Sequence, residues 1–134
     1  MRNSGLRFVC TWTRLRVETT RTPFTTLAQK GQTLRIPIAH NEGRYYLDRN
    51  EIRELEKNDQ IVMRYVNEAN EPTEEANPNG SIDNIAGICN EEGNVMGLMP
   101  HPERASLPVL SPDGRDDGRM IFDSMIRTLN PAGA

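Results

Sequence analysis

The sequence predicts one domain of the α/β or α+β class, built from several strands, some of them antiparallel, and a closing helix. Three observations lead to this prediction. Apolar and polar residues alternate in residues 6–18, two short apolar runs flank a glycine-containing turn in residues 85–100, and residues 116–130 carry apolar side chains at helical spacing. The chain has 134 residues, which is enough for one ordinary domain and no more.

Residues 6–18 (LRFVCTWTRLRVE) are expected to form a long strand, because the segment alternates for much of its length and Trp, Val and Thr favour strands. We interpret Cys10, beside Trp12, as a packing residue of this strand. Residues 33–40 (TLRIPIAH) predict a second strand. Pro37 has no N–H for a strand ladder, so it must lie at a sheet edge or in a bulge.

A helix is predicted to begin after Asp48. The Asp48 carboxylate can cap the first turn, and Glu51 three residues later completes a capping box. Ile52 and Leu55 then face inward. The helix should end near residues 57–58.

The remaining segments predict a strand, a loop, a hairpin and a helix. Residues 60–66 (QIVMRYV) are typical of a strand, and residues 67–81, rich in Asn, Glu and Pro, of a surface loop. Residues 85–100 predict a hairpin that turns at Glu-Glu-Gly. Residues 116–130 predict an amphipathic helix with methionine as core filler. Its apolar face comprises Phe122, Met125, Ile126 and Leu129.

Composition argues against several classes of function. The chain has 16 Lys and Arg against 19 Asp and Glu, a balance that does not indicate binding to nucleic acid or a membrane surface. No run approaches the roughly 20 apolar residues of a transmembrane helix. The two cysteines form neither a zinc pattern nor a CxxC pair, and the N-terminus lacks a signal-peptide core. We therefore expect a reduced, cytoplasmic environment.

His101 is the leading candidate for acid–base chemistry. It lies in MPHPER at the end of a predicted strand, and a proline on either side restricts its backbone. Glu103 can accept a hydrogen bond from one imidazole nitrogen and leave the other free to act as a base. For a bare HPE tripeptide, however, a surface histidine in a proline-rich turn is the more common interpretation.

A base needs a nucleophile, and Cys89 in GICN resembles the approach to a nucleophile elbow. An elbow leads into a helix, whereas here a turn and a second strand follow. In the predicted hairpin Cys89 pairs with about Met96, five residues and roughly 16 Å of extended chain from His101. We therefore interpret Cys89 as an inert strand residue. His40 ends the second predicted strand, and the sequence leaves open whether it belongs to a binding surface or a solvated turn.

Several segments in order resemble one family. They are NSGLRFVCTWTRLRVE, TPFT, IPIAHNEGRYY, EANPNGSIDNIAGICNEEGNVMGLMPHPERA and the closing helix. Over residues 2–129 the chain is similar to the glutamine amidotransferase subunits of phosphoribosylformylglycinamidine synthase, which are class I amidotransferases of purine biosynthesis. PIAHNEG and NEEGNVMGLMPHPER are the most specific matches. The resemblance implies an open α/β sheet of flavodoxin-like character, with the hairpin before the HPE motif and the closing C-terminal helix.

The resemblance also implies a reaction and partners. Such a subunit hydrolyses glutamine to glutamate and ammonia with a Cys-His-Glu triad. The ammonia passes to a large synthetase subunit, assisted by a small accessory subunit, where ATP and Mg²⁺ serve the conversion of formylglycinamide ribonucleotide to the amidine. By match to MPHPER, the resemblance implies that His101 is the general base and Glu103 its orienting residue. It implies no cofactor or metal on this chain.

The chain departs from the family pattern in one major respect. The family's nucleophile elbow, oxyanion loop and first parallel strands precede the segment that matches residues 2–18. We therefore expect residues 1–130 to be the C-terminal part of a single amidotransferase domain, with 131–134 as a tail, and the isolated chain to be inactive and marginally stable. Two alternatives stay open: a non-catalytic module that docks on the synthetase, and an unrelated hydrolase that uses Cys89 with His101.

Overall fold

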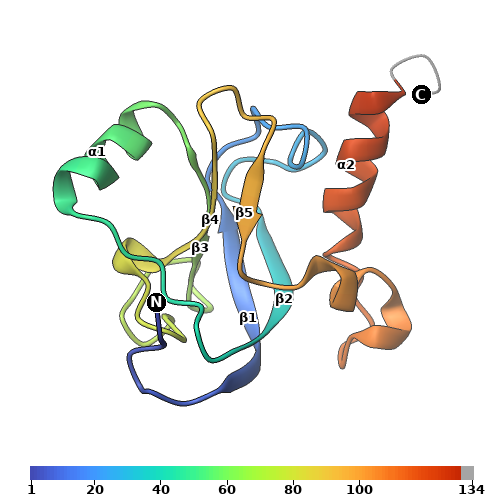
Figure 1. The fold of residues 1–134 in the computed structure, drawn as a ribbon. Coiled ribbons are helices and arrows are strands. Elements are labelled where there is room, and N and C mark those ends of the chain that lie inside the picture. The colour runs from blue at the N-terminus through green and yellow to red at the C-terminus, as the bar shows by residue number, and fades with distance from the viewer. Residues whose placement is uncertain (131–134) are drawn as a thin grey trace.

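The computed structural model describes residues 1–130, which form an antiparallel five-stranded sheet with one helix on either side (Figure 1). The order across the sheet is β2-β1-β3-β4-β5. The strands are β1 (Val9–Val17), β2 (Thr33–His40), β3 (Ile61–Tyr65), β4 (Ile85–Cys89) and β5 (Met96–Leu98). The helices are α1 (Arg49–Lys57) and α2 (Arg119–Leu129), with 3₁₀ turns η1 (Ile82–Asn84), η2 (Pro102–Ala105) and η3 (Pro108–Leu110). The predicted tail at 131–134 lies outside the described residues.

The predicted strands and the hairpin are confirmed, with bounds that differ by a few residues. Every neighbouring pair of strands is antiparallel, and β4 and β5 form the hairpin. β2 lies at one edge of the sheet, so the missing N–H of Pro37 leaves no gap in an interior ladder. The described residues contain no parallel pair of strands. They form a mixed α/β fold, and the flavodoxin-like sheet that the resemblance implies has no counterpart in them.

The two faces of β1 differ in burial. Thr13, Leu15 and Val17 are buried on one face, whereas Cys10 is exposed on the other. The ladder between β1 and β2 has no bulge, so the alternation continues unbroken along the strand and keeps Cys10 on the face opposite Leu15. The interpretation of Cys10 as a packing residue is therefore wrong.

The sheet curls until the chain that follows β5 reaches β2. These strands stand at opposite ends of the strand order, yet the N–H of His101 donates to the carbonyl of Pro37 at 2.8 Å. The main core joins β1, β2, β3 and β4 to η2 and α2. It comprises the buried residues Leu15, Val17, Leu34, Ile36, Ile38, Val62, Met63, Tyr65, Ala86, Cys89, Ala105 and Ile121. The segment that carries His101 is thus attached to both ends of the sheet.

α1 covers a smaller cluster on β3 and β4. Asp48 caps its first turn, and the side chain of Glu51 accepts a hydrogen bond from the Asp48 N–H at 2.9 Å, so the predicted capping box is confirmed. Ile52 is buried against Ile61 and Ile85 in this cluster. The inward orientation predicted for this face of α1 is also confirmed.

α2 lies on the other side of the sheet and is attached mainly by its first half (Figure 1). Ile121 is 2% exposed, and the hydroxyl of Ser124 accepts a hydrogen bond from the N–H of Leu27 at 3.2 Å. The apolar face predicted from spacing is wrong at its outer end, because Ile126 and Leu129 are 58% and 77% exposed. The part of the chain that the structure describes leaves most of these two side chains uncovered.

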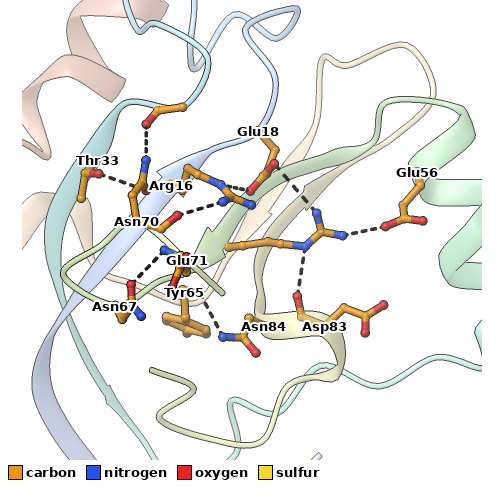
Figure 2. Close-up of polar contacts among 12 residues, drawn as sticks. Arg16, Glu18, Thr33, Glu56, Tyr65, Asn67, Asn70, Glu71, Asp83 and Asn84 are labelled. Carbon is orange, nitrogen blue, oxygen red and sulfur yellow. Dashed lines mark hydrogen bonds and ion pairs between the residues drawn. The ribbon is translucent and has the colours of Figure 1, made fainter. Parts of the chain in front are cut away.

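Charged side chains tie the segment after β3 to the sheet (Figure 2). Arg16 and Arg64 both contact the carboxylate of Glu18, at 2.7 and 3.9 Å. Each arginine also donates to a carbonyl beyond β3, Arg16 to that of Asn70 at 2.9 Å and Arg64 to that of Asp83 at 3.0 Å. Arg16 therefore anchors the segment predicted as a surface loop, and Arg64 anchors η1, which follows that segment.

Candidate active site

His101 and Glu103 form a hydrogen-bonded pair at the beginning of η2. The Nδ1 atom of His101 lies 2.7 Å from Oε1 of Glu103. An ionised carboxylate can only accept a hydrogen bond, so Nδ1 of the neutral imidazole carries the proton and Nε2 keeps its lone pair. The bond from the His101 N–H to Pro37 fixes the backbone beneath the ring. This geometry orients an imidazole to take a proton at Nε2.

The surroundings keep Glu103 ionised. Partial burial acts to raise the pKa of Glu103, but the hydrogen bond from His101, a backbone hydrogen bond and the charge of Arg104 outweigh it and lower the pKa below its ordinary value. The Nε atom of Arg104 lies 3.7 Å from Oε1 of Glu103. A carboxylate in this position would stabilise the imidazolium that forms when Nε2 accepts a proton.

The pair lies open to solvent on the described part of the chain. The side chains of His101 and Glu103 are 31% and 56% exposed. A cavity of about 410 Å³ between residues 42–45 and the β4–β5 hairpin extends to Met99, but neither member of the pair lines it. Catalytic electrostatics is strongest where water is excluded, so a working site requires further walls around the imidazole.

Cys89 takes no part in this pair. It pairs with Met96 across the hairpin, as the sequence predicts, and so lies five residues away from His101 in register. Its thiol is buried under Arg21, whose Nη2 lies 3.4 Å from Sγ. Burial raises the pKa of the Cys89 thiol and outweighs the attraction of Arg21, so the thiol stays protonated at neutral pH. The predicted position of Cys89 in the hairpin is confirmed, and its chemical inertness stays a prediction.

His40 lies in a buried polar cluster, which contradicts the solvated turn, one of the two alternatives that its sequence left open. Its Nδ1 is 2.9 Å from Oδ1 of Asn3, and its Nε2 is 3.3 Å from Nδ2 of Asn79. The Asn79 amide donates, so Nε2 accepts and Nδ1 carries the proton. Burial lowers the pKa of His40. The ring is thus a neutral, fully hydrogen-bonded structural group and belongs neither to a solvated turn nor to the His101 pair.

Sequence reasoning missed both asparagines of this cluster. Asn3 lies 37 residues before His40 in the chain and Asn79 lies 39 residues after it, so no local pattern links them. One local signal does exist: a side chain at Gly43 would collide with the imidazole ring of His40. The glycine of HNEG is therefore required by a close approach of the ring to the backbone.

Three further properties of residues 1–130 bear on the chemistry of this site. No group of three or more His, Cys, Asp or Glu side chains in them is arranged to hold a metal ion. Cys10 and Cys89 are both free thiols. Neither α1 nor α2 is long and apolar enough to cross a membrane.

Known proteins resemble the chain over almost all of its length. It is 56% identical over 123 residues to phosphoribosylformylglycinamidine synthase subunit PurQ of Methanosarcina acetivorans, a match that covers 92% of this chain and 52% of the relative. The subunit PurQ of Salinibacter ruber is 51% identical over 134 residues, which cover 100% of this chain and 56% of the relative. The solved structure of PurLQS from Thermotoga maritima matches with a TM-score of 0.76 and 42% identity, covering 96% of this chain and 51% of that one.

The family of the chain follows from a match that includes His101 and Glu103. The chain spans about half the length of the curated relatives it matches. A model of the CobB/CobQ-like glutamine amidotransferase domain matches residues 1–126, and therefore His101, Glu103 and the hairpin that leads to them. The chain belongs to the family of CobB/CobQ-like glutamine amidotransferase domains.

Proposed function

We propose that this chain is the His–Glu part of a glutamine amidotransferase, the glutaminase component of phosphoribosylformylglycinamidine synthase in purine biosynthesis. One observation carries the proposal: His101 donates Nδ1–H to Glu103 at 2.7 Å and so presents an unprotonated Nε2. The identity of 51–56% to subunits of that name supports the choice of reaction.

In this proposal His101 and Glu103 serve a cysteine that the rest of the domain supplies. Nε2 of His101 takes the proton of that thiol as sulfur attacks the γ-amide carbon of glutamine, and returns it to the departing nitrogen, so that ammonia leaves and a thioester remains. Nε2 next takes a proton from water as the water attacks the thioester. Glutamate is released, and the proton returns to the cysteine sulfur. Glu103 stabilises the imidazolium in both halves of the reaction.

The proposed partners are inferred from the same relatives. The similarity to a chain of PurLQS supports association with a large synthetase subunit and a small accessory subunit, to which the ammonia passes. ATP and Mg²⁺ act on the synthetase, where ammonia replaces the activated amide oxygen of formylglycinamide ribonucleotide. The chain itself needs glutamine and no cofactor, and it works in the cytoplasm.

The open site and the exposed face of α2 support a further element of the proposal. The remaining half of the relatives' length supplies the nucleophile, the water-excluding walls and the parallel strands of a flavodoxin-like sheet. Residues 1–130 are then the C-terminal part of one domain. Without the rest, the chain has a base but no nucleophile, so it is inactive in glutamine hydrolysis.

A second candidate function is a docking module that binds the synthetase without hydrolysing glutamine. Two observations favour this function. The side chains of His101 and Glu103 are exposed to solvent. Neither described thiol is placed to react with them, because Cys10 lies on an outer strand face and Cys89 is buried in β4. Such a module keeps the surface that binds the synthetase but no longer hydrolyses glutamine.

A glutamine analogue that carries a diazoketone distinguishes these functions. The chain is treated with the analogue alone and together with a polypeptide that covers the unmatched part of the Methanosarcina acetivorans relative, and adducts are located by intact-mass spectrometry. The proposal expects no adduct on the lone chain and one adduct on the added polypeptide in the mixture. His101→Ala should abolish that adduct, whereas Cys89→Ala, which removes the buried thiol of the same hairpin unit, should leave it.

Two outcomes contradict the proposal. A stable complex that forms no adduct and turns over no glutamine indicates the docking module. An adduct on Cys89 of the lone chain, lost in His101→Ala, indicates a compact hydrolase and overturns the hairpin argument.

A further inference from the structure

Gly118, the residue before α2, touches the backbone of the turn that carries Glu103. Its N–H donates to the carbonyl of Ala105 at 2.9 Å. A Cβ atom at this position would overlap the carbonyl oxygen of Pro102 and lie 3.0 Å from the carbonyl oxygen of Ala105. Pro102 and Ala105 are the two ends of η2, so Gly118 spans the turn from end to end.

Space, and not backbone freedom, requires glycine here. Gly118 has φ −67° and ψ −24°, a conformation that any L-residue adopts. The close approach of the η2 carbonyls therefore explains the glycine at 118.

The start of α2 is attached directly to β2, whereas η2 is held only at its two ends. Beside Gly118, Asp117 accepts a hydrogen bond from the N–H of Arg35 on the edge of β2 at 2.7 Å. On the opposite side, His101 is bound to Pro37 of the same strand, and Ala105 is fully buried. An added methyl group at 118 must therefore push η2, because both the helix start and the histidine backbone are attached to β2.

We propose that Gly118 is a positioning residue for the acid–base pair, because the absence of a side chain at 118 lets η2 hold Glu103 against Nδ1 of His101. The inference rests on the proposed function, in which this hydrogen bond sets the tautomer of the base. Displacing η2 lengthens the bond from Nδ1 to Oε1. The imidazole then loses the partner that holds its proton on Nδ1.

The tautomer of His101 shows directly whether the hydrogen bond from Nδ1 to Glu103 is present. Long-range ¹H–¹⁵N NMR spectra distinguish Nδ1–H from Nε2–H imidazoles, and the chain has only two histidines, His40 and His101. We expect the full chain at neutral pH to show His101 as the Nδ1–H tautomer. Gly118→Ala should convert it to a mixture in which Nδ1–H no longer dominates, while the buried His40 keeps its Nδ1–H signals and so shows that the fold is intact.

Matched variants separate positioning from general disturbance. Gly97→Ala adds the same methyl group to β5, where nothing lies within 4 Å, and should leave the tautomer of His101 unchanged. Glu103→Gln removes the acceptor carboxylate, and adding Gly118→Ala to it should cause no further change if Gly118 acts through Glu103. An unchanged His101 in Gly118→Ala, or an additional effect in the double variant, overturns the inference.

The experiment also distinguishes a folding defect of Gly118→Ala from a failure of the proposed glutaminase function. If Gly118→Ala also loses the His40 signals, Asp117→Ala takes its place, because it releases residue 118 from β2 without adding atoms and should reduce the Nδ1–H population of His101. A wild-type tautomer there overturns the inference. If His101 in the unaltered chain is already an Nε2–H imidazole, the hydrogen-bonded pair is absent and the proposed function loses its main support, along with this inference.

Discussion

The carboxamide of Asn3 binds both the ring and the backbone of His40. Its Oδ1 accepts the Nδ1–H of the imidazole at 2.9 Å, and its Nδ2 donates to the His40 carbonyl at 2.9 Å. Oδ1 also accepts the N–H of Gly43, and Nδ2 donates to the carbonyl of Arg7. One buried side chain therefore joins the N-terminal segment, the end of β2 and the loop after it.

Asn3→Ala should destabilise the fold strongly. It leaves the Nδ1–H of His40, the N–H of Gly43 and two carbonyls without their partner, and buried polar groups without partners cost about 1–3 kcal/mol each before water enters. We expect a loss of roughly 2–4 kcal/mol in the free energy of unfolding, measured by urea titration. Asn41→Ala is the control, because this neighbouring side chain is exposed. Equal midpoints for the two variants would contradict the role assigned to Asn3.

The same cluster predicts a dependence of stability on pH. Burial lowers the pKa of His40 below its ordinary value of 6.5. As the pH falls below 6.5, His40 binds a proton in the unfolded chain while it stays neutral in the folded chain. The contribution of neutral His40 to the free energy of unfolding is therefore complete above pH 6.5 and declines below it. An NMR titration of the His40 ring should therefore give a midpoint below 6.5. A midpoint at or above 6.5 would show that the ring is not held neutral.

The two thiols should differ in reactivity. Cys10 is exposed on the outer face of β1, whereas Cys89 is buried and has a raised pKa. Because the thiolate is the reactive form, iodoacetamide at neutral pH should alkylate Cys10 first and Cys89 only after unfolding. Mass spectrometry of peptides from native and urea-treated chains measures both rates. Rapid native alkylation of Cys89 would restore it as a candidate nucleophile.

Local patterns predicted most of the elements, because each depends on residues close together in the chain. The box of Asp48 and Glu51, the turn before β5 and the edge position of Pro37 all follow from the chemistry of one turn or one strand. The pairing of Cys89 with Met96 follows from the same local counting. The Glu103 hydrogen bond to His101 was also predictable, since two residues separate its partners.

The failures concern contacts between distant segments. Periodicity predicts that α2 has an apolar face, but it cannot tell which part of that face meets a partner, and Ile126 proved exposed. The environment of His40 depends on Asn3 and Asn79, which the fold brings together from opposite directions along the chain. The contact of Gly118 with η2 depends on the curl of the sheet, which no local pattern contains.

The outer face of α2 should bind the remainder of the domain. In the lone chain Ile126 and Leu129 are mostly exposed, so changing both to Gln should alter the free energy of unfolding by less than about 1 kcal/mol. Burial of such side chains contributes about 1.5–3 kcal/mol each. If the rest of the domain covers them, the double variant should bind the complementary polypeptide at least tenfold more weakly in calorimetric titration, since about 1.4 kcal/mol is a factor of ten.

A variant on the inner face of the same helix gives the opposite pattern and makes the result specific. Ile121 is buried in the core, so Ile121→Ala should lower the stability of the lone chain by roughly 2–4 kcal/mol. Binding measured where that variant is still folded should change little, because Ile121 already has its partners within the chain. Unchanged affinity of the Ile126 and Leu129 double variant would mean that the rest of the domain packs elsewhere, and that α2 keeps this face for another subunit or for water.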